Sequence, residues 1–118
     1  MRNLFFILFI SLFVNLNGQS FVQTGEFSVE KTKVSNYMLD SGSDQERTLQ
    51  LNITFPKQYK NKPEVMLSVT KFDGEKGINT RYSVKLLSVH KAGFSMEIKT
   101  WGGSKIYMIG GMWMAIGE

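Results

Sequence analysis

The sequence predicts an all-β protein, a six-stranded antiparallel β-sandwich that is expected to oligomerise. Apolar and polar residues alternate with a period of two in several segments, which is typical of strands with one buried face. No segment shows a sustained helical period. Clusters of Gly, Pro, Asp and Ser separate the alternating segments at regular spacing, as in a sandwich of short strands.

The first 18 residues are not expected to belong to this fold. Arg2 precedes an almost unbroken apolar run, Leu4 to Val14, and polar and small residues follow it up to Gly18. Such a run is too short to span a bilayer and is typical of a secretory signal peptide. We therefore expect a signal peptide at residues 1–18, with cleavage within a few residues of Gly18, and a secreted single β-domain at residues 19–118 without membrane insertion.

In the first half of this domain, two strands are expected. Phe21–Val29 is rich in apolar residues and mildly alternating, and residues 36–44 then carry turn chemistry. The clearest strand covers residues 48–55, where every second side chain is apolar and the others are polar. Pro56 ends this strand, and a basic loop follows at residues 57–63.

Three further strands are expected at residues 65–72, 82–86 and 94–98, each with apolar residues at alternate positions. Lys91–Gly93 fits a hairpin turn between the last two of them. Trp101–Ser104 fits a second tight turn, because its two glycines can take positive φ.

The last expected strand, residues 105–116, is apolar on both faces. In an antiparallel sheet one face usually meets water. Two interpretations remain open: the strand is fully covered in a small sandwich, or its outer face packs on another copy of the chain through flexible Met side chains. Gly110–Gly111 would allow a close backbone approach or a bulge.

Composition excludes several classes of function. The net charge is +4 and the basic residues are scattered, so neither a nucleic-acid-binding stripe nor a polybasic membrane face is present. The chain contains no Cys, which excludes disulfides, thiolate metal sites and Cys nucleophiles. Its single imidazole, His90, cannot form a metal cluster, and no glycine-rich phosphate-binding loop precedes a helix. We expect no metal and no other cofactor.

Enzymatic activity is also not expected. Asp40 and Asp44 could suggest a carboxylate pair for glycoside hydrolysis. That reaction needs two acids that face each other across the scissile bond, and a small sandwich has little room for a deep cleft.

The remaining chemistry is that of a carbohydrate-binding surface. Asp44 lies in a polar Gly-Ser loop, Arg81 opens a strand, and Trp101 and Tyr107 flank the Gly102–Gly103 turn. A carboxylate accepts hydroxyl protons from a sugar, a guanidinium donates to neighbouring hydroxyls, and a ring covers the apolar face of a pyranose. Each charge-assisted hydrogen bond contributes about 1.5–3 kcal/mol before desolvation. A structural interpretation also fits, in which Asp44 caps a turn, Arg81 is a solvated edge residue and Trp101 belongs to the core.

An ordered set of short motifs covers nearly the whole expected domain. It comprises Val22-Gln23-Thr24-Gly25, Gly42-x-Asp44, Asn52-Ile53-Thr54-Phe55, Pro63-x-Val65-x-Leu67-Ser68-x-Thr70, Asp73, Asn79-x-Arg81, Gly93-Phe94, Thr100-Trp101, Lys105-x-Tyr107 and Trp113. In the order and spacing of these motifs the chain resembles the H-type lectin domain family, of the snail agglutinin and discoidin C-terminal type.

This resemblance implies a six-stranded sandwich that assembles as a trimer and binds galactose or N-acetylgalactosamine in shallow sites at subunit boundaries. The sugar-binding Asp of the family falls on Asp44, a backbone contact on Gly42 and the Arg on Arg81. The aromatic pair of the family falls on Trp101 and Tyr107. The same side chains were selected above from their chemistry.

The chain departs from the snail agglutinins at several positions. Gly102 stands where they carry a His, which removes an imidazole donor and is expected to widen the site. We keep Gly102 among the candidate carbohydrate-binding residues, and the preference for N-acetylgalactosamine or galactose stays open. The intrachain disulfide positions fall on Phe27 and Ile98, where we expect an apolar contact. The interchain Cys falls on Lys60, which excludes a covalent hexamer but leaves a homotrimer or a non-covalent hexamer open.

Three functional hypotheses follow. The first is a secreted, non-enzymatic lectin for galactose-type glycans, in which three presented copies raise avidity roughly 10²–10⁴-fold over single-site affinity. The second is a structural or adhesion module that has lost sugar binding and contacts a protein partner. The third is a small glycosidase, or a carbohydrate-binding accessory of one.

Overall fold

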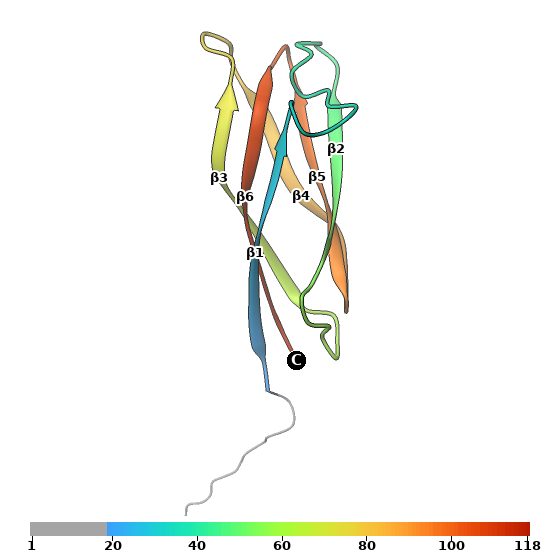
Figure 1. Ribbon diagram of the computed structural model, residues 1–118. Coiled ribbons are helices and arrows are strands. Elements are labelled where there is room, and N and C mark those ends of the chain that lie inside the picture. The colour runs from blue at the N-terminus through green and yellow to red at the C-terminus, as the bar shows by residue number, and fades with distance from the viewer. Residues whose placement is uncertain (1–18) are drawn as a thin grey trace, which may run out of the picture.

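The computed structural model describes residues 19–118, which form six antiparallel strands in two three-stranded sheets (Figure 1). The strands are β1 (Phe21–Glu30), β2 (Arg47–Thr54), β3 (Glu64–Gly74), β4 (Arg81–His90), β5 (Gly93–Trp101) and β6 (Ile106–Gly117). The predicted all-β class and the six-stranded antiparallel sandwich are confirmed. The signal peptide expected at residues 1–18 lies outside the described residues. Within residues 19–118, no helix is long and apolar enough to cross a membrane.

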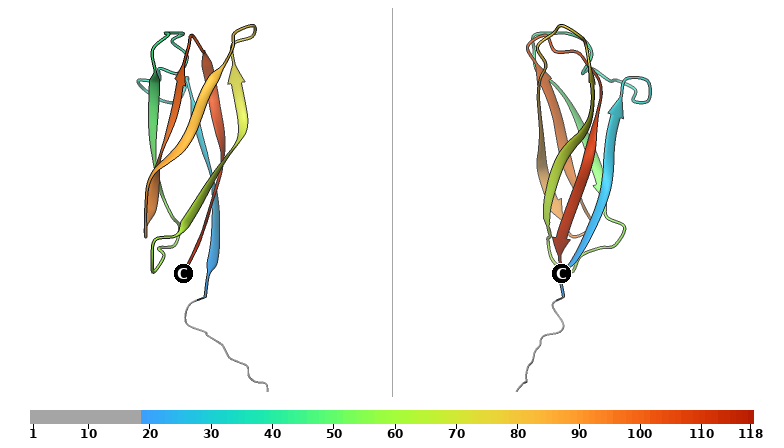
Figure 2. Two further views of the ribbon diagram at one scale, coloured as in Figure 1. Left: turned by 180° about the vertical axis from the view of Figure 1, so that it is seen from behind. Right: turned by 90° about the vertical axis from the view of Figure 1, so that its left-hand side faces the viewer.

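One sheet has the strand order β1-β6-β3 and the other has the order β2-β5-β4. The two last strands of the chain therefore occupy the centres of the two sheets, and the β5–β6 turn connects one layer to the other (Figure 2). The β1–β2 loop, the β3–β4 loop and the β5–β6 turn gather at one end of the sandwich, and the C-terminus lies at the other end (Figure 1).

The strands extend beyond their apolar segments at most ends. β4, expected at residues 82–86, runs from Arg81 to His90, and β5, expected at residues 94–98, runs from Gly93 to Trp101. The backbone hydrogen bonds between strands continue into the polar residues at the strand ends. Pairing satisfies the backbone N–H and C=O groups of every residue, whether its side chain is apolar or polar.

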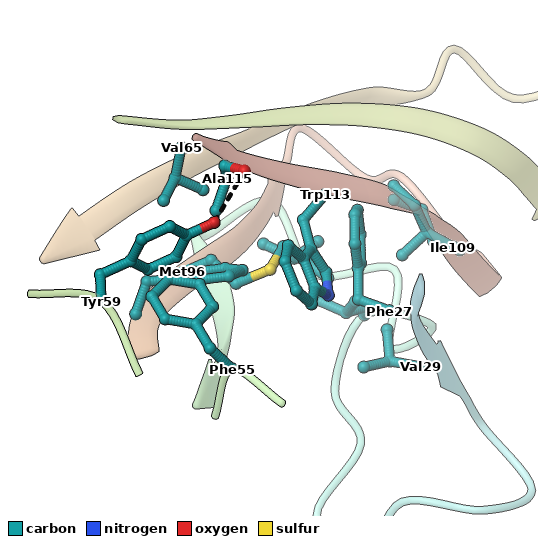
Figure 3. Close-up of a cluster of buried hydrophobic side chains, with 13 residues drawn as sticks. Phe27, Val29, Phe55, Tyr59, Val65, Met96, Ile109, Trp113 and Ala115 are labelled. Atoms are coloured by element: carbon teal, nitrogen blue, oxygen red, sulfur yellow. Dashed lines mark hydrogen bonds between the residues drawn. The ribbon is translucent and has the colours of Figure 1, made fainter. Parts of the chain in front are cut away.

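Aromatic side chains form the centre of the core between the sheets (Figure 3). The Phe55 and Phe94 rings lie 5.6 and 5.7 Å from the Trp113 ring, centroid to centroid. Tyr59 of the β2–β3 loop is also buried, and its hydroxyl donates to the Ala115 carbonyl at 2.9 Å, which satisfies the polar end of the ring. A Cβ on Gly25 would lie 2.5 Å from the Trp113 indole, so only glycine leaves room for this ring. Further core members are Phe27, Ile98, Val29, Val65, Met96 and Ile109.

The outer face of the β1-β6-β3 sheet carries an exposed apolar cluster along β6. Met112, Met114 and Ile116 of β6 are 40–43% exposed, and Val22 and Met66 beside them are more exposed still. The residues that the structure describes therefore leave this face of the last strand uncovered, and the interpretation of a fully covered strand does not hold within them.

The Gly110–Gly111 pair serves both of the purposes expected from the sequence. A Cβ on Gly111 would collide with the Ser68 carbonyl, so the pair allows a close backbone approach. The register of β3 against β6 also shifts between Val69 and Lys71, directly opposite these glycines.

Candidate functional site

The β5–β6 turn, Trp101–Ser104, is the structural centre of the candidate site. Gly102 and Gly103 have φ values of 69° and 81°, which confirms the expected positive φ. The buried Ser104 hydroxyl donates to the Trp101 carbonyl at 2.8 Å and accepts from the Arg81 amide at 2.8 Å. The turn and the first residue of β4 are therefore fixed relative to each other.

The β1–β2 loop brings Asp44 to one side of this turn. The Gly102 amide donates to the Asp44 carbonyl at 3.3 Å, and the Gly103 amide donates to the Ser43 carbonyl at 3.1 Å. A Cβ on Gly103 would lie 3.6 Å from Asp44 Oδ1, so the Asp44 carboxylate lies directly beside the turn. Gly42, with φ of 75°, turns the loop two residues earlier.

Arg81 lies against the turn at Gly102. Its Nη1 donates to the Gly102 carbonyl at 3.4 Å, a long hydrogen bond. A Cβ on Gly102 would lie 2.8 Å from Nη1 and 3.2 Å from Cδ of Arg81. The room that Gly102 leaves is therefore filled by the Arg81 side chain, and the site is not widened there as the sequence suggested.

The two charges of the site are free to act on a ligand. Asp44 and Arg81 are both exposed, and neither forms an ion pair with any residue in the range 19–118. A carboxylate acceptor and a guanidinium donor at the same glycine turn can bind neighbouring hydroxyl groups.

Trp101 is half-buried on the outer face of the β2-β5-β4 sheet, and it pairs with Arg81 in the β4–β5 register. The interpretation of Trp101 as a core residue is therefore wrong, because its strand directs Thr100 and Ile98 inward instead. Lys99 Nζ lies 5.8 Å from the Trp101 ring centroid and 3.7 Å from Glu46. The ring thus borders the turn as an aromatic surface.

Tyr107 makes different contacts. It belongs to β6, its hydroxyl donates to the Glu75 carboxylate, and Lys31 Nζ lies 5.4 Å from its ring centroid. The hydrogen bond to Glu75 raises the pKa of the Tyr107 phenol, and desolvation and nearby carboxylates add to this shift. Among residues 19–118, no hydrogen bond or ring contact joins Tyr107 to the other candidates.

The structure therefore groups five of the six expected residues around one turn and leaves Tyr107 out of contact with them. The five are Gly42, Asp44, Arg81, Trp101 and Gly102. No group of three or more His, Asp or Glu side chains in the described part of the chain could hold a metal ion. The site is an open polar surface at the end of the sandwich.

Sequence reasoning did not identify Arg47 and Ser104 as parts of this site. Arg47 is 4% exposed, and its guanidinium donates to carbonyls on both sides of the site. A signal for it was present, because the alternation of Leu49, Leu51 and Ile53, continued backwards, puts Arg47 on the inner face. Ser104 carried no comparable signal, since its role depends on the turn geometry.

Comparison with known proteins places these residues in a wider context. A family model described as the H-type lectin domain matches residues 50–116, a range that includes Arg81, Trp101, Gly102 and Tyr107 but not Gly42 or Asp44.

Two solved structures of discoidin II from Dictyostelium discoideum resemble this chain with TM-scores of 0.69 and 0.70, both at 26% sequence identity. The matched regions cover 83% and 90% of this chain, and they correspond to 36% and 40% of the two discoidin II chains. A protein from Fuscovulum blasticum described as ATP synthase subunits region ORF 7 is 30% identical over 72 residues, which is 61% of this chain and 63% of that protein. The chain thus spans less than two thirds of the length of each.

Proposed function

The chain belongs to the H-type lectin domain family, and from this premise we propose that it is a secreted, multivalent lectin that binds galactose- or N-acetylgalactosamine-type sugars at the Gly102–Gly103 turn. The family model matches more than half of the chain, and its members bind carbohydrates without catalysing a reaction. The sugar class, the site, secretion at residues 1–18 and multivalency are the parts that we add.

The observation that carries the proposal is the meeting of Asp44, Arg81 and Trp101 at one glycine turn. The carboxylate and the guanidinium lie at the same turn without ion-pair partners among residues 19–118. Hydrogen bonds from such charged groups to sugar hydroxyls contribute about 1.5–3 kcal/mol each before desolvation is subtracted. An open site of this kind supports weak binding of one sugar and leaves strong binding to multivalency.

We further propose that the outer face of the β1-β6-β3 sheet is the contact between copies in a homotrimer. Exposed apolar side chains adjoin each other there, and a hollow of about 360 Å³ lies among Thr24, Met66, Met112 and Met114. Soluble monomers rarely expose a continuous apolar surface of this kind. Tyr107 does not contact the other candidates within one chain. In the proposed trimer, Tyr107 of one protomer would contact the sugar that is bound to the site of its neighbour.

Titration calorimetry with galactose and N-acetylgalactosamine tests the sugar site. Asp44→Asn keeps the shape of the side chain but removes its charge, and we expect the dissociation constant to rise at least tenfold. Asp40→Asn is the matched control, because Asp40 belongs to the same loop but pairs with Lys31 at 3.3 Å. This control is expected to bind sugar like the wild type.

Two results would contradict the proposed site. One is an Asp44→Asn variant that binds these sugars as tightly as the wild type. The other is a wild-type protein that binds no galactoside on a glycan array although it is oligomeric, which would favour a structural or adhesion module. Release of the chromophore from a nitrophenyl galactoside would instead revive the glycosidase hypothesis.

A further inference from the structure

Arg47 opens β2 and is almost completely buried on the inner side of the sheet, with 4% of its surface exposed. Its guanidinium has no carboxylate partner among residues 19–118, although an isolated buried charge is costly. Backbone carbonyls therefore supply the whole of its polar environment in the described structure.

The Arg47 guanidinium donates five hydrogen bonds to backbone carbonyls. Nε donates to the Gln45 carbonyl at 3.2 Å and Nη2 donates to the Ser43 carbonyl at 2.7 Å. Nη1 lies 3.4, 3.3 and 3.0 Å from three further carbonyls, those of Met38, Leu39 and Ser104. Four of the five acceptors belong to the β1–β2 loop, and the fifth belongs to the β5–β6 turn.

The bonded carbonyls lie next to the residues of the sugar site. Ser43 precedes Asp44, and its carbonyl also accepts from the Gly103 amide at 3.1 Å. Ser104 follows Gly103, and its hydroxyl holds the Arg81 amide at 2.8 Å. One guanidinium is thus joined to the backbone that carries Asp44 and to the backbone that positions Arg81.

We infer that Arg47 is the positioning residue of the sugar site: its buried guanidinium holds the Gly42–Asp44 loop against the Gly102–Ser104 turn and thereby sets the affinity for sugar. This inference rests on the proposed function. The planar fork of an arginine can reach carbonyls in several directions at once, whereas a lysine ammonium donates from a single point.

The first test measures sugar affinity. Arg47→Lys keeps the charge but cannot span both loops, so the dissociation constant for galactose is expected to rise at least tenfold. Met96→Ala is the control, because Met96 is fully buried in the middle of β5 and touches neither loop by a hydrogen bond. We expect this control to lower the melting temperature at least as much and to leave the dissociation constant of the folded protein unchanged.

The second test does not depend on sugar binding. Hydrogen exchange of the Gly102 and Gly103 amides reports their bonds to the Asp44 and Ser43 carbonyls. In Arg47→Lys these two amides are expected to exchange at least tenfold faster, while amides in the middle of β5 change much less. In Met96→Ala, the exchange of the two glycine amides is expected to change no more than that of the other amides.

Arg47→Gln is the second variant, to be used if Arg47→Lys does not fold. Its neutral side-chain amide can still donate two hydrogen bonds. The inference is overturned if a folded variant binds sugar like the wild type, if its exchange rises uniformly, or if both variants fail to fold and Arg47 proves a general determinant of stability. A wild-type protein that binds no galactoside would refute the proposed function, while the exchange data would still decide whether Arg47 joins the two loops.

Discussion

The outer faces of the two sheets differ sharply in chemistry although the same pleat generates both. The β2-β5-β4 face is polar, with Asn52, Ser95, Glu97, Lys85 and Lys99 directed outward, and Lys85 pairs with Glu97 at 3.9 Å. On the β1-β6-β3 face, Met112, Met114 and Ile116 of β6 form an exposed apolar row, and Glu26 and Glu64 lie beside it on the outer strands.

This difference is the basis for the proposal that a further copy of the chain covers the β1-β6-β3 face, while water covers the β2-β5-β4 face. Alternation within each strand already provides one inner face for the core, so a second apolar face adds nothing to the fold of a single chain. The candidate sugar site lies at the end of the sandwich, where the turn that joins the two central strands meets the β1–β2 loop. Assembly through the apolar face would leave the polar face in solvent.

The largest expected effect comes from placing a charge on the apolar face. Met114→Glu would bury an unpaired carboxylate between protomers, which costs several kcal/mol, so we expect a trimer to dissociate. Light scattering after size-exclusion chromatography should show the mass fall to one third. Asn52→Glu, which places the same charge on the polar face, should leave the mass unchanged. A monomeric wild type would remove the basis of the comparison.

A smaller effect is expected from the inner side of the same strand. Trp113 is 4% exposed in the core, so Trp113→Ala should lower the free energy of unfolding by about 3–5 kcal/mol. Met112→Ala changes the neighbouring residue on the outer face. When it is introduced into the Met114→Glu variant, which is expected to be monomeric, it should lower the free energy of unfolding by less than about 1 kcal/mol. Urea unfolding measures both, and equal losses would show that the two faces do not differ as described.

The smallest effect concerns alkaline pH at the beginning of β6. The Tyr37 hydroxyl donates to the Ile106 carbonyl at 2.7 Å, and burial raises the pKa of this phenol, with Asp40 and Asp73 adding to the shift. Above about pH 10 the unfolded chain loses this proton while the folded chain keeps it, so stability falls as pH rises.

Tyr37→Phe should therefore lose about 1 kcal/mol near neutral pH, through the missing hydrogen bond, and should decline less steeply than the wild type above pH 10. Urea unfolding between pH 8 and 11 measures both slopes. Parallel slopes would show that Tyr37 does not link this end of the apolar sheet to pH.

The strands and turns could be predicted from the sequence because local patterns determine them. The alternation around Leu49 and Leu51 and the glycines of the β5–β6 turn specify backbone conformation within a few residues. The β1–β2 loop was harder to predict, since Leu39 is buried there by contacts with distant strands.

Only part of the site could be predicted, because some of its residues are recognisable from their side chains and others depend on long-range contacts. Asp44, Arg81 and Trp101 carry chemistry that is visible in the sequence, and the structure gathers them at the turn. The long-range bonds of Arg47 could not be predicted, because its acceptors are carbonyls, which every residue has. Tyr107 looked like part of the same group from its position after the turn, but its hydroxyl bonds to Glu75.

The central claim is that the Gly102–Gly103 turn and the adjoining Asp44 loop bind the sugar. Titration of the isotope-labelled wild-type protein with galactose, followed by amide NMR signals, tests it most directly. The account predicts that the largest and saturable shifts belong to Asp44, Gly102 and Gly103, with little change at the opposite end of the sandwich. Saturable shifts centred elsewhere, or no shifts up to high sugar concentration, would contradict it.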